Sequence, residues 1–239
     1  IDLWGRFTKR IGYWVDSTKA YFTLDPAYME VVWHLFKHAS DEGRLYKDYR
    51  VVPWCPHDET ALSSHELAQG YEDVKDVTVT AKFELEDEPG TYLLAWTTTP
   101  WTLPGNVALA VGKDIDYVKA LKIRQESVLK DGAENGPTVT REEHLIVAKA
   151  LAESVLGENP HIEASFKGSE LVGKRYKPLY PYARELAPEA ERAKFENAFA
   201  VYPADFVTTT EGTGIVHTAV MYGQDDFELG SKVGLPKVH

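Results

Sequence analysis

The sequence has a single cysteine, Cys55, so an intrachain disulfide is impossible and a reducing compartment, the cytoplasm, is the expected location. It has no apolar run of about 18 residues, the length that a membrane-spanning helix needs. No basic-then-apolar signal segment stands at the start, and a chain that begins with Ile1 instead of Met is interpreted as a piece of a longer protein. We therefore expect no membrane partner.

Basic residues are also scarce: 26 Lys and Arg stand against 37 Asp and Glu, which gives a net charge of −11. Contacts to phosphates need Lys and Arg, so the chain as a whole is a poor non-specific binder of nucleic acid. A nucleic-acid partner would have to be held locally or by other parts of a parent protein. With 239 residues and 44% hydrophobic residues, the chain suits one large domain, or one domain with an appendage.

Several familiar sites are missing as well. The sequence 55–58, Cys-Pro-His-Asp, resembles half of a zinc site, but no second cysteine exists and His65 is ten residues away from Cys55, so we predict no metal. Cys55 could act as a thiol nucleophile, yet a lone cysteine is more often an inert small hydrophobe. There is no Gly-x-Ser-x-Gly elbow and no Walker loop, and Gly212-Thr213-Gly214 lacks the third glycine of a dinucleotide site.

One stretch that is rich in chemistry spans residues 96–106, Trp-Thr-Thr-Thr-Pro-Trp-Thr-Leu-Pro-Gly-Asn, between the apolar runs 92–95 and 107–111. Pro100 and Pro104 fix φ and remove N–H donors, so the stretch cannot be an uninterrupted central strand or a helix. We predict a stiff loop that directs its hydroxyls at a small polar ligand. The alternative is an ordinary structural segment, because Thr favours strands and Trp is usually core.

A second stretch, 211–227, combines a Gly-rich turn, a strand ending near His217 and a helix starting between Gly223 and Asp226. Taken alone, a histidine at a strand end is usually a packed structural residue. Two aspartates at a helix start, Asp225 and Asp226, usually compensate the helix dipole. Only the joint pattern of the two stretches favours a functional site.

The periodicity predicts an α+β protein with a closed, β-barrel-like core and peripheral helices. Helices are expected over 26–43, where Asp25 caps and the apolar face packs, and over 140–157, where Thr140 and Glu143 match a capping box. Residues 124–139 are expected to form an exposed loop or hairpin, and residues 168–188 mostly turns. Strands are expected at 51–54, 77–85, 92–95, 107–111, 117–121, 198–202 and 205–207.

The two stretches together closely resemble the editing domain of isoleucyl-tRNA synthetases, the connective peptide 1 insertion of that class I aminoacyl-tRNA synthetase family. Segments 7–16, 44–47, 62–66 and 70–71 also match the family, so the resemblance covers nearly the whole chain. It departs from the family at Asp58, where relatives often have the second cysteine of a Cys-x-x-Cys, and at Val220, where they usually have proline. The motifs of the synthetic site are absent.

The resemblance implies hydrolytic editing of mischarged Val-tRNA(Ile) at the terminal adenosine ester, with valyl-adenylate as a further candidate substrate. It implies that Asp226, with Asp225 as the neighbour that could be confused with it, binds the substrate's α-ammonium group. Thr98, Thr99 and Thr102 would bind substrate and position water, with Thr97 in support. Trp96 and Asn106 would shape the pocket and the adenosine contact. His217 would limit side-chain size; a role as general base is also open.

The resemblance further implies that residues 1–45 are a helical lead-in from the parent catalytic core and that residues 46–239 are the editing domain. The expected partners are the valine-bearing 3′ acceptor end of tRNA(Ile) and the remainder of the parent synthetase, and a monomer is expected. No cofactor is expected, since ATP would serve only the absent synthetic site. Two alternatives stay open: a non-catalytic module that binds the tRNA acceptor end, and a structural insertion whose site has decayed.

Overall fold

A computed structural model describes residues 2–127 and 138–238 of the chain. The chain folds as two compact units, Ile1–Arg50 and Val51–His239. This division lies five residues after the predicted start of the editing domain at residue 46, and that assignment stays a prediction. The first unit contains α1 (Asp2–Arg10), η1 (Ser17–Lys19) and α2 (Pro26–Asp41).

Helix α2 begins and ends close to its predicted bounds. Pro26 occupies its first turn, where a missing N–H costs nothing, and Asp25 occupies the N-cap position without a side-chain cap hydrogen bond. The predicted packing of its apolar face is not found among the described residues, since no residue of α2 is buried and Trp33 is 72% exposed. Amphipathic spacing predicted the helix correctly, because it is a local property, but it could not say what covers the face.

The second unit begins with a small hairpin and a capped helix. Strands β1 (Trp54–Cys55) and β2 (Thr60–Ala61) pair in antiparallel fashion, and α3 (Ser64–Gln69) follows. Ser63 and Glu66 form a reciprocal capping box at the start of α3. The predicted strand at 51–54 is therefore only the short β1, shifted toward the hairpin.

Two larger sheets follow. The five-stranded sheet has the order β3-β4-β7-β6-β8, and the three-stranded sheet has the order β10-β5-β9. The strands of the first are β3 (Val79–Glu84), β4 (Thr91–Thr97), β7 (Thr138–Ala148), β6 (Asp116–Ser127) and β8 (His161–Lys167). Those of the second are β10 (Ile215–Thr218), β5 (Ala108–Val111) and β9 (Ala200–Pro203).

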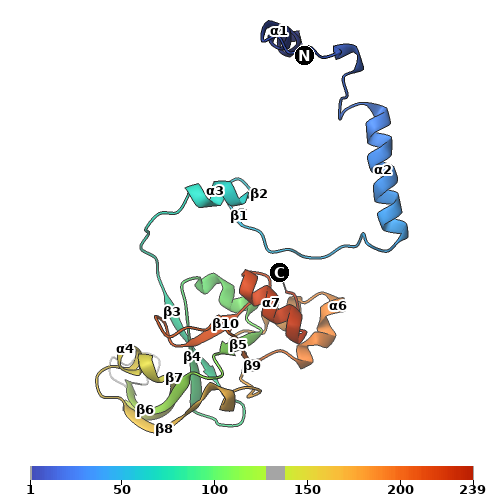
Figure 1. Cartoon of the computed structure of the whole chain (residues 1–239). Helices are drawn as coiled ribbons and strands as arrows, with labels where there is room; N and C mark the ends of the chain where they lie inside the picture. The colour runs from blue at the N-terminus through green and yellow to red at the C-terminus, as the bar shows by residue number, and fades with distance from the viewer. Residues whose placement is uncertain (1, 128–137, 239) are drawn as a thin grey trace, which may run out of the picture. The chain divides into compact units, whose positions relative to one another are not determined.

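Short helices connect and cover these strands, and Figure 1 shows α7 beside β10 and β5. They are η2 (Pro100–Gly105), η3 (Lys149–Leu151), α4 (Ala152–Leu156), η4 (Gly168–Glu170), α5 (Tyr182–Leu186), α6 (Glu189–Arg192), η5 (Ala193–Glu196) and α7 (Gln224–Val233).

Helices and strands are mixed as predicted, but the barrel-like core is not confirmed. Among the described residues the strands form open sheets, with β3 and β8 at the edges of one and β10 and β9 at the edges of another. Strands β4 and β7 pair over only three residues before they diverge. Closure into a barrel needs continuous pairing around the ring, which these edges do not provide.

The predicted helix over 140–157 is wrong for most of its length. Residues 138–148 form β7, and only η3 and α4 are helical. Leu145, Ile146 and Val147 are all buried, because β7 lies between β4 and β6 with both faces covered. Glu143 does not cap a helix: its carboxylate accepts a hydrogen bond from Lys82 on β3 at 2.6 Å. Sheet burial thus overrode the local capping pattern.

Of two further expectations, one is confirmed and one is wrong. Residues 124–139 were predicted to form an exposed loop or hairpin, and the hairpin is confirmed where the structure describes it, since β6 and β7 pair in antiparallel fashion up to Ser127 and Thr138; residues 128–137 lie outside the described residues. Residues 205–207 form a turn and not a strand. Val207 is buried there beside Ala110 and Leu229, so its apolar character reflects packing against β5 and α7.

Candidate active site

The Thr-rich stretch spans the end of β4 and the short helix η2. Trp96 and Thr97 finish β4, and Pro100 opens the 3-10 helix with Thr102 and Leu103 buried. The prediction of a loop that contains no helix is therefore wrong for residues 100–105, because proline's fixed φ suits the first turn of a short 3-10 helix. Hydrogen bonds lock the turn: the Thr99 amide donates to Thr97 Oγ1 at 3.1 Å, and Thr102 Oγ1 donates to the Thr99 carbonyl at 2.7 Å.

His217 comes from β10, which pairs with β5 so that His217 lies opposite Leu109. The turn before β10 requires its glycines, since Gly212 and Gly214 have φ of +77° and +73°. A Cβ on Gly212 would lie 2.9 Å from the Trp96 ring, so this turn packs directly against the end of β4. Tyr117 on β6 fixes the same turn by donating its hydroxyl hydrogen to the Gly214 carbonyl at 2.6 Å.

The two segments meet through a hydrogen bond between Thr102 Oγ1 and His217 Nε2, 2.9 Å apart. Because Thr102 already donates its only hydrogen to the Thr99 carbonyl, Nε2 must be the donor in this pair. Nδ1 then carries a lone pair; it is buried and has no hydrogen-bond partner among the described residues. Burial lowers the pKa of His217 to about 4, so the imidazole is neutral at physiological pH.

Asp226 reaches the same region from the first turn of α7. Its Oδ1 is buried and has no hydrogen-bond partner within the described part of the chain. Burial raises the pKa of Asp226 to about 6, and the charge of neighbouring Asp225 adds to the rise. Gly223 makes this position possible, because a Cβ there would clash with Asp226 Oδ2.

These elements enclose a cavity of about 260 Å³. It is lined by Trp96, Thr97, Thr98, Thr99, Thr102, Val216, His217, Ala219, Tyr222 and Asp226. Hydroxyls line one side and a buried carboxylate another. A cavity smaller than the roughly 300–1,000 Å³ of drug-sized sites suits a ligand group the size of an amino acid.

The cavity brings together seven of the nine predicted site residues. Asn106 is not in the lining: its amide nitrogen donates to the Ala108 carbonyl at 2.9 Å, and its oxygen accepts from the Tyr176 hydroxyl at 2.6 Å. Asp225 lines a different hollow, together with Lys113 and Lys232. Neither residue contributes its side chain to the lining, and the roles assigned to both remain predictions.

Three lining residues were missed from the sequence, namely Val216, Ala219 and Tyr222. Tyr222 follows β10 in the turn before α7, and its ring lies 3.0 Å from the position that a Cβ on Gly105 would occupy. An aromatic residue between two site motifs was the only signal that could have identified it. Apolar residues such as Val216 and Ala219 carry no sequence signal of a binding role.

Within residues 2–127 and 138–238, no group of three or more His, Cys, Asp and Glu side chains is arranged to hold a metal ion. The Cys55 thiol donates to Asp58 Oδ2 at 3.3 Å within the turn that joins β1 and β2. None of the described helices combines the length and apolar character needed to cross a membrane.

Comparison with known proteins agrees with the two motifs. Residues 1–221 match the family described as tRNA synthetases class I (I, L, M and V). The chain belongs to this family. It is 45% identical over 238 residues to an isoleucine--tRNA ligase of Clostridium novyi, covering 100% of this chain and 20% of that protein. It is 44% identical over 239 residues to the enzyme of Clostridium acetobutylicum, with the same coverage of 100% and 20%.

These matches confirm the resemblance to isoleucyl-tRNA synthetase, and the chain spans about a fifth of the length of these relatives. Among solved structures it is similar to GlLeuRS-CP1, at a TM-score of 0.45 and 20% identity over 66% of this chain and 60% of that one. It is also similar to the P. knowlesi cytosolic leucyl-tRNA synthetase editing domain, at a TM-score of 0.46 and 16% identity over 69% of this chain and 66% of that one.

Proposed function

We propose that this chain hydrolyses the ester of Val-tRNA(Ile), and so provides the editing activity of an isoleucyl-tRNA synthetase, with valyl-adenylate as a further candidate substrate. The observation that supports this most directly is the shared cavity between the Thr-rich turn and the His217–Asp226 segment. It presents hydroxyls and a carboxylate to a group the size of an aminoacyl ester.

Asp226 binds the substrate's α-ammonium group in this proposal. A buried carboxylate oxygen without a partner is costly, and a cationic ligand removes the cost by forming a charge-assisted hydrogen bond. The pKa of about 6 leaves Asp226 ionised at neutral pH, and a bound ammonium group would lower it further. Binding through the ammonium group fixes the ester at a set depth in the cavity.

The threonines and His217 then act on the reacting end. The Thr98 and Thr99 hydroxyls position the attacking water and the ester carbonyl, and the Thr102–His217 hydrogen bond holds the imidazole against the cavity. An efficient general base has a pKa near the working pH, whereas burial keeps the pKa of His217 at about 4. A positioning and steric role for His217 therefore fits better than proton abstraction.

Selectivity rests on size. One methylene in an apolar pocket changes binding by only about 1–3 kcal/mol, a value for which isoleucyl enzymes themselves are the reference case. A second, smaller cavity removes the errors that remain, because it admits an isopropyl group and excludes a sec-butyl group. Val216, Ala219 and His217 supply the walls for this exclusion. Hydrolysis of an activated ester needs no cofactor, so none is proposed.

The decisive experiment incubates the chain with Val-tRNA(Ile) and Ile-tRNA(Ile) side by side and follows release of the amino acid. Hydrolysis of the valyl ester alone supports the proposal. Tight binding of both without ester cleavage would favour a non-catalytic module for the acceptor end. Neither binding nor cleavage, with no thermal shift from valine analogues, would favour a decayed site. In the proposal the partners are tRNA(Ile) and the rest of the parent enzyme, and the chain is a cytoplasmic monomer.

A further inference from the structure

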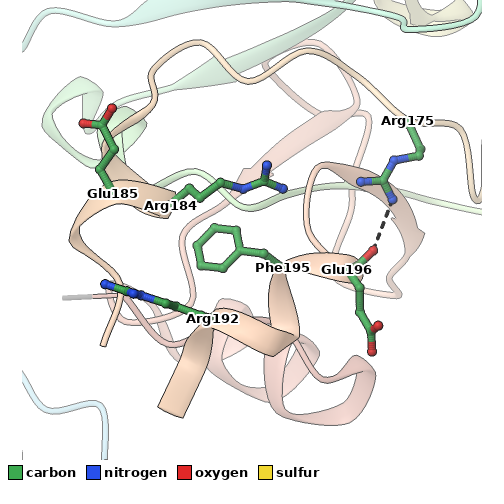
Figure 2. A pocket seen from close by; sticks show the side chains of 6 residues that line it. All are labelled: Arg175, Arg184, Glu185, Arg192, Phe195 and Glu196. Atoms are coloured by element: carbon green, nitrogen blue, oxygen red, sulfur yellow. Dashed lines mark hydrogen bonds between the residues drawn. The ribbon is translucent and has the colours of Figure 1, made fainter. Parts of the chain in front are cut away.

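A second cavity, of about 630 Å³, is lined by three arginines and lies outside the candidate active site. Figure 2 shows the side chains that line it: Arg184 lies beside the ring of Phe195, Arg192 extends with its guanidinium group directed away from the ring, and Arg175 lies next to Glu196. We call it the arginine cavity. Three guanidinium groups around one hollow are notable in a chain with a net charge of −11.

The backbone around the arginine cavity is well anchored. Arg184 lies on α5, Arg192 ends α6, and Phe195 lies on η5, while Ala183, Ala187 and Phe195 bury their side chains in the core. Arg184 lies over the Phe195 ring at 5.7 Å from its centroid. Arg175 donates to the carbonyls of Glu196 and Ala198 at 3.3 and 2.9 Å, so its role is partly structural.

Two of the arginines lack an acidic partner among the described residues. Arg184 and Arg192 are exposed and form no ion pair with any residue that the structure describes. The lysines of the same segment are paired, with Lys177 at 2.7 Å from Glu84 and Lys194 at 2.8 Å from Glu191. In Figure 2 the carboxylates of the two marginal glutamates point away from the central Phe195 ring. The guanidinium groups are thus free to bind an external anion.

Flat aromatic surface adjoins the arginines. A neighbouring hollow of about 310 Å³ shares Arg175, Arg184 and Glu185 with the arginine cavity and adds Tyr180 and Phe199. The rings of Tyr180 and Tyr182 stack at 5.8 Å with an interplanar angle of 13°, and they are 41% and 48% exposed. Guanidinium groups for phosphates beside exposed rings for bases are the combination that binds single-stranded RNA.

One element of the arginine cavity contacts an element of the candidate active site. Helix α5, which carries Arg184, contacts η2, which carries Thr102. An RNA strand that leaves the candidate active site on the side of α5 would meet Arg184.

We propose that the arginine cavity binds backbone phosphates of the RNA strand whose terminal aminoacyl ester enters the candidate active site. This inference rests on the proposed function for the identity of the RNA, but not for the binding itself. The ligand chemistry is a phosphodiester held by the guanidinium groups of Arg184 and Arg192. Arg175 fixes the backbone around them.

The test measures binding of uncharged tRNA(Ile) to the full chain over a range of salt concentrations. The double variant Arg184→Gln with Arg192→Gln is compared with a control double variant, Lys122→Gln with Lys149→Gln. The control removes the same two positive charges from the second compact unit, at lysines that form no ion pair within the described ranges. Losing two phosphate contacts to a single strand should reduce the magnitude of the slope of log K against log salt by about 1.4 and raise Kd about 10-fold at low salt. The control pair should change the slope by less than about half of this. Circular dichroism and thermal melting check that each variant folds.

Two further arms separate the possible outcomes. If inorganic phosphate or AMP displaces the RNA as well as RNA of equal phosphate concentration does, the cavity does not bind a strand. Equal salt slopes for the double arginine variant and the double lysine variant would also overturn the proposal. In the hydrolysis assay the arginine pair should raise KM for Val-tRNA(Ile) and leave kcat within about two-fold. If the chain cleaves no ester but the double arginine variant binds RNA more weakly than the parent, the proposed function fails and this inference stands. If the chain cleaves the valyl ester but the double arginine variant binds RNA as tightly as the parent, the proposed function stands and this inference fails.

Discussion

The hydroxyl of Thr102 and the Nε2 atom of His217 lie 2.9 Å apart, although 115 residues separate them in the chain. Both residues are buried, at 7% and 8% exposure, and their side chains are hydrogen-bonded to each other. The bond ties the Thr-rich turn of one sheet to the edge strand β10 of the other. It joins the two walls of the cavity, together with the packing of Gly212 against Trp96.

Replacing Thr102 by Val, which keeps the shape and removes the hydroxyl, should leave the Nε2–H of His217 unpaired. An unsatisfied buried donor costs about 1–3 kcal/mol, so we expect a lower unfolding free energy by that amount in urea titration. Hydrolysis of Val-tRNA(Ile) should fall as well. Thr208→Val, at an exposed threonine whose hydroxyl contacts Thr210, is the matched control and should change neither quantity.

Asp226→Asn should abolish the ammonium contact while keeping the side chain's size. A charge-assisted hydrogen bond of roughly 3 kcal/mol corresponds to about 100-fold in kcat/KM, and we expect at least that loss in a steady-state deacylation assay. Asp225→Asn removes the same charge from an adjacent residue that does not line the cavity, and it should stay within a few-fold of the parent. Equal losses from the two variants would contradict the assignment of Asp226.

The same Asp226→Asn variant should be more stable than the parent at neutral pH. The pKa of Asp226 is raised from 3.8 to about 6 by burial, so the folded state binds the proton more tightly than the unfolded state does. Its ionised form therefore destabilises the fold above pH 6, and this cost disappears as pH falls below about 4. A shift of this size corresponds to roughly 2–3 kcal/mol. Urea midpoints at pH 7.5 and pH 4 should show a gain for the variant at the first pH and almost none at the second.

His217→Ala should enlarge the cavity and admit the correct product. One methylene is worth about 1–3 kcal/mol in an apolar pocket, so preference for the valyl over the isoleucyl ester should drop by about 10-fold or more. The measurement is the ratio of initial deacylation rates for the two esters. His161→Ala, at an exposed histidine on β8, is the control. An unchanged ratio in the His217 variant would remove the steric role.

Gly223→Ala tests whether this glycine positions Asp226. The backbone at Gly223 is extended, with φ of −152°, so alanine fits the backbone and only the contact with Asp226 Oδ2 must change. We expect about a 10-fold loss in kcat/KM, in line with a displaced reacting group. Gly70→Ala, where the nearest atoms lie at an ordinary 3.8 Å, should leave activity unchanged. Full activity in the Gly223 variant would show that the carboxylate has room to move.

Sequence patterns predicted most elements whose signal is local. Alternation located β3, and apolar runs located β4 and β5, because each strand needs one buried face wherever it pairs. The capping box at Thr140 failed because the buried position of β7 between two strands outweighed it. A single sequence contains the local preference but not the neighbours that override it.

The sequence alone determined the chemistry available to the site and the family to which the chain belongs, because the threonines, the histidine and the aspartate of the two motifs are recognised from residue type and spacing. Only the tertiary structure decided which of them meet. Pairing of β5 with β10 places His217 beside Thr102, whereas the same fold commits Asn106 to Ala108 and Tyr176. Contacts between residues 70 to 115 positions apart depend on sheet register, and register is fixed by packing across the whole domain.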